Sequence, residues 1–283
     1  MIIRKHSNKN EYVVTTDGLW VRNFNTIRIP IDVNKLNKDD YKSLNTNEFL
    51  NSKLGFSDVE DIDLGSRNII IVSDGYDFTN KCKLLTEKIM KTGAIIGING
   101  ALKKWPLISE KRGMVYLINN PYPESMSFLP KHIYFPTCIA STRTYPEFMK
   151  SYRGEIFTYV PTPEIGFDSS TYAPKFKIDD YRNPVCAALS IAHHMSAQKI
   201  LLFCCDDAFK EDRPGSIDTG KQTYMYPQHL ISQRLIDANL FWLKHKNPNI
   251  KIADYSSGGD YVNAEYINSE QGVLEFFEEE EDG

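Results

Sequence analysis

The sequence predicts an α/β fold in which a mostly parallel β-sheet is flanked by helices. Two observations carry this prediction. Short, continuous apolar runs recur along the chain, as in strands that are buried on both faces. Segments with helical spacing separate these runs, and such alternation is typical of a parallel sheet with right-handed crossovers. The length of 283 residues suits one α/β domain, or one such domain with a small extra unit.

The first predicted strand of this sheet is Asn68–Ser73, where the sequence reads NIIIVS. A helix follows at Thr79–Met90 and ends before Gly93, a residue type that stops helices. The next predicted elements are strands at Ala94–Ile98, Met114–Ile118, Ile133–Phe135, Cys138–Ala140 and Ile156–Val160, and a short helix at Ala101–Trp105.

The second half of the chain continues the alternation. Glu164–Tyr181 has no clear period and is predicted to be a long loop, a feature that is often functional in compact domains. Asn183 and Pro184 have the residue types of a helix N-cap and a first helical turn. The remaining elements are a strand at Lys199–Cys204, a loop at Phe209–Thr223, a long helix from Pro227 and a last strand at Asn249–Ala253.

The chain divides into three predicted units, which are an N-terminal appendage (residues 1–65), a Rossmann-like α/β domain (66–268) and a C-terminal helix with an acidic tail (269–283). The appendage has β-prone runs at Tyr12–Thr16 and Ile27–Val33. Its stretch Lys38–Phe56 is polar and predicted to be helical. We expect this appendage to have only a weak core of its own.

Composition argues against several classes of protein. The formal net charge is −4 and no basic stripe is present, so a nucleic-acid partner is not expected. The N-terminus lacks a signal-peptide core, and no run of about 18 apolar residues exists. We therefore expect a cytoplasmic protein, with peripheral contact to the inner membrane left open. The five cysteines include no C-x-x-C pair, so we expect free, buried thiols and no metal site.

Polar residues follow most of the predicted strands at the point where each strand ends. In open parallel sheets, ligands bind outside the carboxyl ends of the strands, so these positions form the expected site before any motif is considered. They are Ser73, Asp74, Gly75, Asn99, Gly100, Asn119, Asn120, Ser141, Thr142, Arg143, Thr162, Asp206 and Asp207.

The side chains in this set suit recognition of a nucleotide or a sugar. Asn99 and Asn120 offer donors and acceptors that fit a base or a sugar hydroxyl, although asparagine also commonly caps loops. Gly75, after Asp74, would let the backbone approach a phosphate at a helix N-terminus, but a simple strand–helix turn explains the pair equally well. Asp206 suits a general base, a metal ligand or a helix cap.

His229 lies at the start of the predicted long helix, directly after a loop. Imidazole titrates near neutral pH, which suits proton transfer, and a helix N-terminus favours its neutral form. We therefore expect His229 to act as a general base. The sequence contains no G-x-S-x-G, P-loop or H-E-x-x-H motif.

The order of these features resembles the bacterial sialyltransferases that use CMP-activated sialic acid, the group that contains lipooligosaccharide enzymes. It is also similar to the MptE-like domain of motility-associated-factor flagellin glycosyltransferases and to the archaeal pterin diphosphokinase MptE. The resemblance runs from about Asn68 to Ile267 and lies in motif order. It is carried by Ser73–Asp77, Ile98–Ala101, Asn120–Pro121, the segment VCAALSIAHHMSAQKILLFCCDD and Tyr224–His229.

The resemblance implies a role for each matching position. The family's glycine-rich loop corresponds to Ser73–Asp77, where only Gly75 matches outright. The family's G-x-D corresponds to Cys204–Asp206, with Cys204 in place of glycine and Asp206, an expected catalytic residue, at the family's aspartate. By resemblance, His229 deprotonates the acceptor hydroxyl, while Tyr224 and Tyr226 hold the CMP phosphate. The remaining residues expected to bind substrate or nucleotide are Asp74, Gly75, Asn99, Asn120, Ser141, Thr142 and Asn183.

The resemblance thus implies a sialyltransferase-like glycosyltransferase that moves a sialic-acid-like sugar from a CMP donor to a glycan or glycoprotein without a metal cofactor. Two alternatives stay open. The first is an MptE-like 6-hydroxymethylpterin diphosphokinase that uses ATP and Mg, although Asn119 and Asn120 stand where its acidic motif would be. The second is a degenerate, non-catalytic binding protein. A homo-oligomer is compatible with the sequence.

Overall fold

The computed structural model describes residues 2–5, 11–15, 18–22, 38–75, 78–81, 87–101, 114–129, 135–161, 177–178, 180, 183–205, 216–218, 223–225, 227–256 and 261–278. For the described residues up to 42 and between 216 and 231, and for Thr79, Asn80, Glu87, Lys177 and Arg234, only the backbone is described.

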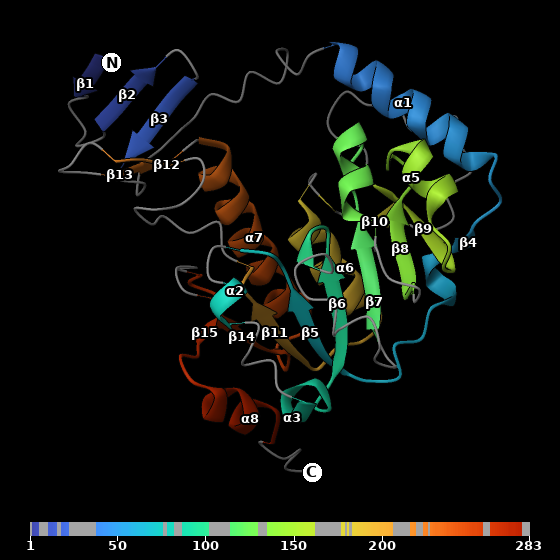
Figure 1. Cartoon of the computed structure of the whole chain (residues 1–283). Helices are drawn as coiled ribbons and strands as arrows, with labels where there is room; N and C mark the ends of the chain where they lie inside the picture. The colour runs from blue at the N-terminus through green and yellow to red at the C-terminus, as the bar shows by residue number, and fades with distance from the viewer. Residues whose placement is uncertain are drawn as a thin grey trace.

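Most of the described strands form one large parallel sheet, which confirms the predicted α/β class (Figure 1). The strand order is β10-β9-β8-β7-β6-β5-β11-β14-β15, and β4 pairs with β9. Every described strand pair in this sheet is parallel. The strands are β4 (Ser57–Asp58), β5 (Asn68–Val72), β6 (Ala94–Ile98), β7 (Met114–Ile118), β8 (Thr137–Ser141), β9 (Ile156–Pro161), β10 (Lys177–Ile178), β11 (Lys199–Phe203), β14 (Lys251–Tyr255) and β15 (Glu265–Tyr266).

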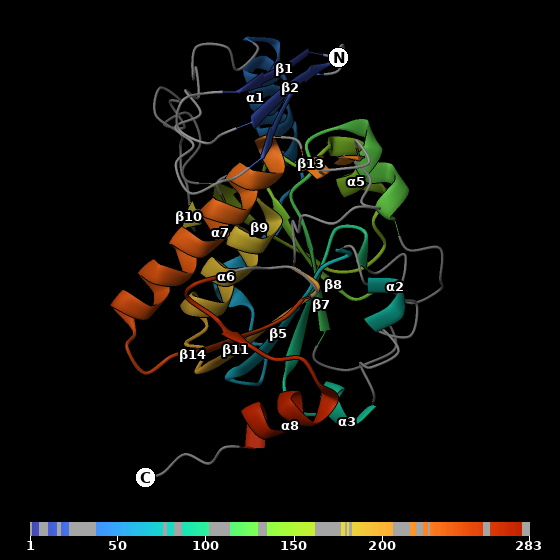
Figure 2. The ribbon, with the colours of Figure 1, turned by 90° about the vertical axis from the view of Figure 1, so that its left-hand side faces the viewer.

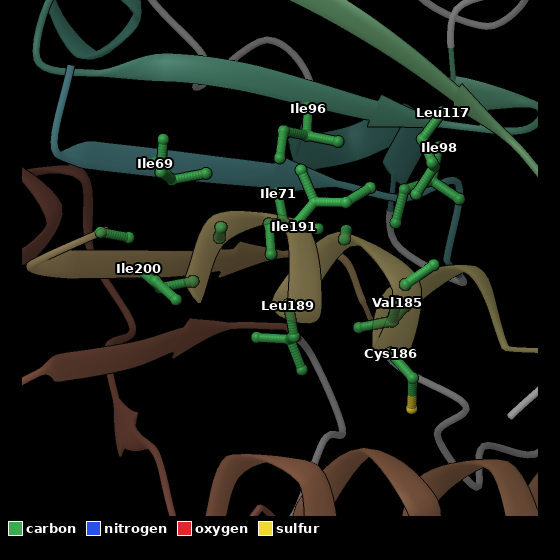
Figure 3. Packing of buried hydrophobic residues seen from close by; sticks show 14 of the residues in the cluster. Ile69, Ile71, Ile96, Ile98, Leu117, Val185, Cys186, Leu189, Ile191 and Ile200 are labelled. Carbon is green, nitrogen blue, oxygen red and sulfur yellow. The ribbon is translucent and has the colours of Figure 1, made fainter. Parts of the chain in front are cut away.

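Each face of the sheet has its own hydrophobic core, because successive strand residues point to opposite faces. Ile69 and Ile71 of β5 pack on the face covered by α6 (Pro184–His194) and α7 (Pro227–Lys246). Figure 3 shows these isoleucines beside Ile191 of α6. Ile70 and Val72 pack on the other face, to which four helices contribute, namely α2 (Phe78–Lys81), α3 (Glu87–Met90), α5 (Pro146–Ser151) and α8 (Glu270–Glu278).

The chain reverses its direction of winding at the junction of β5 and β11. From β5 the chain proceeds through β6, β7 and β8 to one side, whereas from β11 it proceeds to β14 on the other side. The carboxyl ends of two such strands form the usual ligand crevice of open α/β sheets, because their crossovers leave in opposite directions. The topology therefore places the expected site at the carboxyl ends of β5 and β11 and of the strands beside them.

The start of α6 was predicted correctly. Oδ1 of Asn183 accepts hydrogen bonds from the backbone N–H groups of Val185 (2.8 Å) and Cys186 (3.2 Å), and Pro184 occupies the first helical position. A proline fits there because its missing N–H has no partner within the helix anyway. The cap therefore fixes where α6 begins, and β11 is the next strand after this helix.

A second, five-stranded sheet has the strand order β1-β2-β3-β13-β12 and lies at the upper left of Figure 1, by the start of α7. Its strands are β1 (Ile2–Lys5), β2 (Glu11–Thr15), β3 (Gly18–Arg22), β12 (Ser216–Asp218) and β13 (Thr223–Met225). The predicted loop at Phe209–Thr223 is therefore wrong at Ser216–Asp218, which becomes a strand because it pairs with Thr223–Met225. The last long strand is Lys251–Tyr255 and not Asn249–Ala253.

Helix α1 (Lys38–Ser52) confirms the predicted helix in the first part of the chain. It lies along the top of Figure 1, over the loops that follow β7 and β8. Further along, β4 joins the large sheet through parallel pairing of Ser57 with Phe157 and Asp58 with Thr158 of β9. The boundary at residue 65 stays a prediction, but parts of residues 1–65 contact the α/β domain directly.

The thiols of Cys138, Cys186, Cys204 and Cys205 are free and buried, as predicted for four of the five cysteines. Among the described helices, none is both long enough and apolar enough to span a membrane.

Candidate functional site

The predicted strand-end residues that the structure describes meet at one edge of the large sheet. Because β5, β6, β7, β8 and β11 run parallel, their carboxyl ends share this edge. The described members are Ser73, Asp74 and Gly75 after β5, Asn99 and Gly100 after β6, Asn119 and Asn120 after β7, and Ser141, Thr142 and Arg143 at the end of β8. Thr162, Asp206, Asp207 and Tyr226 lie outside the described residues.

The loops after β5 and β11 are joined through their backbones. The N–H of Ser73 donates to the carbonyl of Phe203, and the N–H of Gly75 donates to the carbonyl of Cys204, each at 3.1 Å. Cys204 has a left-handed backbone with φ of 52°. Glycine adopts this conformation most easily. The backbone at the end of β11 therefore makes a turn that is unusual for a cysteine.

The loops after β5 and β6 also touch. A Cβ atom added to Gly100 would lie 3.1 Å from Cγ of Asp74 and closer still to Oδ2 of that carboxylate. A side chain at this position would have to displace the Asp74 carboxylate. Asp74 is thus held beside the end of β6, and Gly100 is the reason that it can come so close.

Asn99 has a fixed backbone and a left-handed conformation, with φ of 43°. Its N–H donates to the carbonyl of Leu117 (3.0 Å), and its carbonyl accepts from the hydroxyl of Tyr116 (2.9 Å). Asparagine tolerates this region of φ better than most residues. Burial raises the pKa of Tyr116 well above its usual value, with smaller contributions from Cys138 and Asp74, so the hydroxyl stays a donor to Asn99.

Two buried polar atoms at the carboxyl ends of β6 and β8 have no hydrogen-bond partner within the described part of the chain. They are Oδ1 of Asn99 and Oγ1 of Thr142. A buried polar group without a partner costs on the order of 1–3 kcal/mol. This acceptor and this hydroxyl are therefore candidates for hydrogen bonds to a ligand.

Tyr159 and Asp180 form a buried polar pair that the sequence analysis missed. The Tyr159 hydroxyl donates to Oδ2 of Asp180 at 3.1 Å. Burial and then the charge of Asp180 raise the pKa of Tyr159 well above its usual value, while the nearby Ser141 and Asn119 side chains act in the opposite direction. The hydroxyl thus connects the ends of β7, β8 and β9. No local pattern marks a tyrosine in an apolar strand as part of a polar network.

Helix α1 holds the loop after β8 through two asparagine side chains. Nδ2 of Asn51 donates to the carbonyls of Thr142 (2.9 Å) and Thr144 (2.7 Å). Nδ2 of Asn47 donates to the carbonyls of Pro121 (2.9 Å) and Arg143 (3.1 Å). These bonds fix the backbone that carries Thr142, so a helix from the N-terminal part of the chain shapes the candidate site.

An ion pair joins the same two segments. Nε of Arg143 lies 3.4 Å from Oε2 of Glu48, and both side chains are buried. A buried charge is costly unless it is paired, so removal of either partner would be strongly destabilising. Arg143 therefore ties the loop after β8 to helix α1.

Lys81 of α2 brings a positive charge to the junction of β5, β11 and β14. Its Nζ lies 4.3 Å from the centre of the Tyr255 ring and 3.5 Å from the Tyr255 carbonyl. That carbonyl also accepts from the N–H of Cys204 at 3.4 Å. The sequence analysis did not single out Lys81, because one lysine in a polar helix carries no distinctive signal.

The other predicted site residues have the following positions. Both ends of the Asn183 amide are used, since Oδ1 caps α6 and Nδ2 donates to Oγ of Ser232 at 2.5 Å. Oδ1 of Asn120 accepts from the N–H of Tyr122 at 2.8 Å. Tyr224 lies in β13 and His229 in the first turn of α7, where only the backbone is described. Among the described side chains, no three His, Cys, Asp or Glu residues are grouped as a metal site.

The fold is similar to that of a solved MAf glycosyltransferase from Magnetospirillum magneticum AMB-1. The two structures align with a TM-score of 0.60 and 12% sequence identity over 82% of this chain. The aligned part is 38% of the MAf chain, so this chain spans well under half of that protein. No protein-family description and no curated protein sequence matches this chain. The likeness shows a glycosyltransferase-like α/β fold.

Proposed function

We propose that this chain is a sialyltransferase-like glycosyltransferase that binds a CMP-activated sugar at the carboxyl edge of the large sheet. The unpartnered polar atoms of Asn99 and Thr142 carry the proposal, because an amide oxygen and a hydroxyl suit hydrogen bonds to a base or a ribose. The fold likeness to a MAf glycosyltransferase supports glycosyl transfer as the reaction type.

The proposed reaction assigns a task to each part of the site. His229 takes the proton of the acceptor hydroxyl, whose oxygen then forms a bond to the anomeric carbon of the donor sugar. The bond from that carbon to the phosphate oxygen breaks, and CMP leaves with the electron pair. Tyr224 and Tyr226 donate to the phosphate, and Lys81 adds a positive charge beside it. Asp206 orders the loop after β11.

We further propose that transfer needs no metal, because hydroxyl and ammonium groups can stabilise the charge of the departing phosphate. The acceptor is a glycan or a glycoprotein. The four free, buried thiols fit a reducing compartment such as the cytoplasm.

Calorimetric titration with CMP, CMP-sialic acid, UDP- and GDP-sugars and ATP with Mg tests the proposal. CMP and CMP-sialic acid should bind, and slow release of CMP from the donor should continue in EDTA. Thr142→Val removes one hydroxyl at constant volume, and Asn99→Gly removes one amide without straining the backbone. Each should weaken CMP binding by about tenfold.

Asn45→Ala, on the exposed side of α1, is the matched control and should leave CMP binding unchanged. Binding of ATP with Mg alone would favour the diphosphokinase alternative. Binding of CMP without any donor cleavage would favour the non-catalytic alternative.

A further inference from the structure

Two large apolar side chains project from the C-terminal half of α7. Phe241 and Trp242 are 54% and 55% exposed, although their neighbours Leu240 and Leu243 are buried in the core. The Phe241 and Trp242 rings pack edge to face with centres 5.9 Å apart, and the exposed His245 ring contacts both. We call these three residues the aromatic surface. These half-exposed rings, in contact with each other, leave a continuous apolar patch open to solvent.

Positive charges border the aromatic surface. Lys244 and Lys246 lie in the same last turn of α7. Burial and then the charges of Lys246 and His194 lower the pKa of His193, which places the end of α6 beside this turn. Among the described side chains, Lys244 and Lys246 form no ion pair with an acid. The border of the aromatic surface is therefore cationic where α6 and α7 end.

Asp237, one turn before Phe241 on α7, already has hydrogen-bond partners within the protein. Oδ1 of Asp237 accepts from both the N–H and Nδ2 of Asn263, each at 3.1 Å. This carboxylate is therefore directed toward the segment after β14 and does not offset the lysines of the last turn.

We propose that the aromatic surface docks the protein on an anionic phospholipid bilayer. Tryptophan and phenylalanine enter the boundary between headgroups and acyl chains, while neighbouring lysines contact negative headgroups. The candidate site lies at the opposite end of α7. Phe241 follows His229 by 12 residues of this helix (241 − 229), so about 18 Å separates the two along the helix axis. Figure 2 shows α7 running from the small sheet to the lower left edge of the molecule.

Charge and area favour a bilayer over a second copy of the chain. A two-fold contact brings the same surface of both subunits together. Lys244 and Lys246 of one subunit would then lie near the same two lysines of the other subunit, and the like charges would repel. The two half-exposed rings also offer only roughly 250 Å² of apolar surface, against the ~800 Å² that each partner buries in a stable interface. A small aromatic anchor with several cations suits a charged lipid surface better. This inference does not depend on the proposed function.

Vesicle flotation tests the proposal with the full chain. Vesicles of phosphatidylcholine alone are compared with vesicles that contain one-quarter phosphatidylglycerol, at low and high salt. The protein should float at least tenfold better with the anionic vesicles, and high salt should reduce this. Trp242→Ser should lower binding about tenfold. The double variant Lys244→Glu, Lys246→Glu should abolish the preference for anionic vesicles.

Phe49→Ser is the matched control, because Phe49 of α1 is also a half-exposed ring beside a lysine, Lys53, but lies elsewhere on the molecule. It should float like the unmodified protein. Brominated lipids should quench tryptophan fluorescence in the unmodified protein and much less in Trp242→Phe, which still binds. Equal binding to both vesicle types, or a concentration-dependent dimer in ultracentrifugation that Trp242→Ser turns into a monomer, would overturn the proposal.

Discussion

The carboxylate of Asp74 occupies the space that a Cβ atom on Gly100 would take, so the loops after β5 and β6 approach closely at these two residues. This contact places an acid beside Asn99 at the edge of the sheet where we propose that the nucleotide binds. The shape of that edge therefore depends on a residue with no side chain.

Replacing Gly100 by alanine should lower the free energy of unfolding by about 1–3 kcal/mol, because the new methyl group must displace the Asp74 carboxylate. Urea denaturation measures the change. The double variant Gly100→Ala, Asp74→Ala should recover part of the loss, which a double-mutant cycle would show as a coupling between the two positions. Strictly additive effects would mean that the carboxylate does not restrict this position.

Asn51→Ala should destabilise the protein by about 2–4 kcal/mol, because the buried carbonyls of Thr142 and Thr144 would each lose a donor. Asn45→Ala changes the same residue type on the exposed side of α1 and should stay within about 0.5 kcal/mol. Thermal and urea unfolding of the two variants gives the comparison. Equal stability of both would show that α1 does not hold the loop after β8.

The protein should lose stability in alkaline solution. Folding raises the pKa values of Tyr116 and Tyr159, in each case mainly through burial. Below the unfolded value of about 10 their contribution is complete. As the pH rises toward the folded pKa values, the unfolded chain binds fewer protons than the native one and stability falls. Each group adds a slope of up to about 1.4 kcal/mol per pH unit.

Urea denaturation between pH 8 and pH 11 measures this slope. Tyr159→Phe should make the fall of the unfolding free energy with pH less steep, because one of the two titrating tyrosines is gone. The variant also loses the hydrogen bond to Asp180, so its unfolding free energy is lower at every pH. Tyr116→Phe should have the same effect on the slope. If the unfolding free energy of the unmodified protein and of both variants fell equally steeply with pH, Tyr116 and Tyr159 would not be the groups that cause the loss of stability.

His229→Ala should reduce sugar transfer by about a hundredfold or more and leave CMP binding and unfolding unchanged. Initial rates with a CMP-sugar and a glycan acceptor measure the effect. Added imidazole should restore part of the lost rate, which would not happen if His229 only supported the fold. Full activity of the variant would remove His229 from the reaction.

The elements of the large sheet could be predicted because their signals are local. β5, β6, β7 and β11 are unbroken apolar runs, and the cap of α6 needs only Asn183 followed by Pro184. The same local signals predicted that Asn99 and Thr142 follow parallel strands and so lie at the carboxyl edge of the sheet.

The polar contacts around the candidate site could not be predicted, because they join distant parts of the chain. Tyr159 meets Asp180 only after β9 and β10 pair, and Asn51 meets Thr144 only after α1 crosses the sheet edge. Asn47 and Asn51 looked like ordinary polar residues of a surface helix. The left-handed turn at Cys204 has no local cause in a run such as LLFCC, because cysteine does not favour that conformation.

The pairing of Val21 with Met225 couples the beginning of the chain to a strand that is translated roughly 200 residues later. At about 5–20 residues per second, a ribosome releases β3 at least ten seconds before β13 exists. Until then, the edge of β3 that pairs with β13 presents unsatisfied backbone groups to any other strand in the cell. The small sheet can therefore be completed only after most of the chain has been made, and a translation product that ends before β13 would keep that edge open.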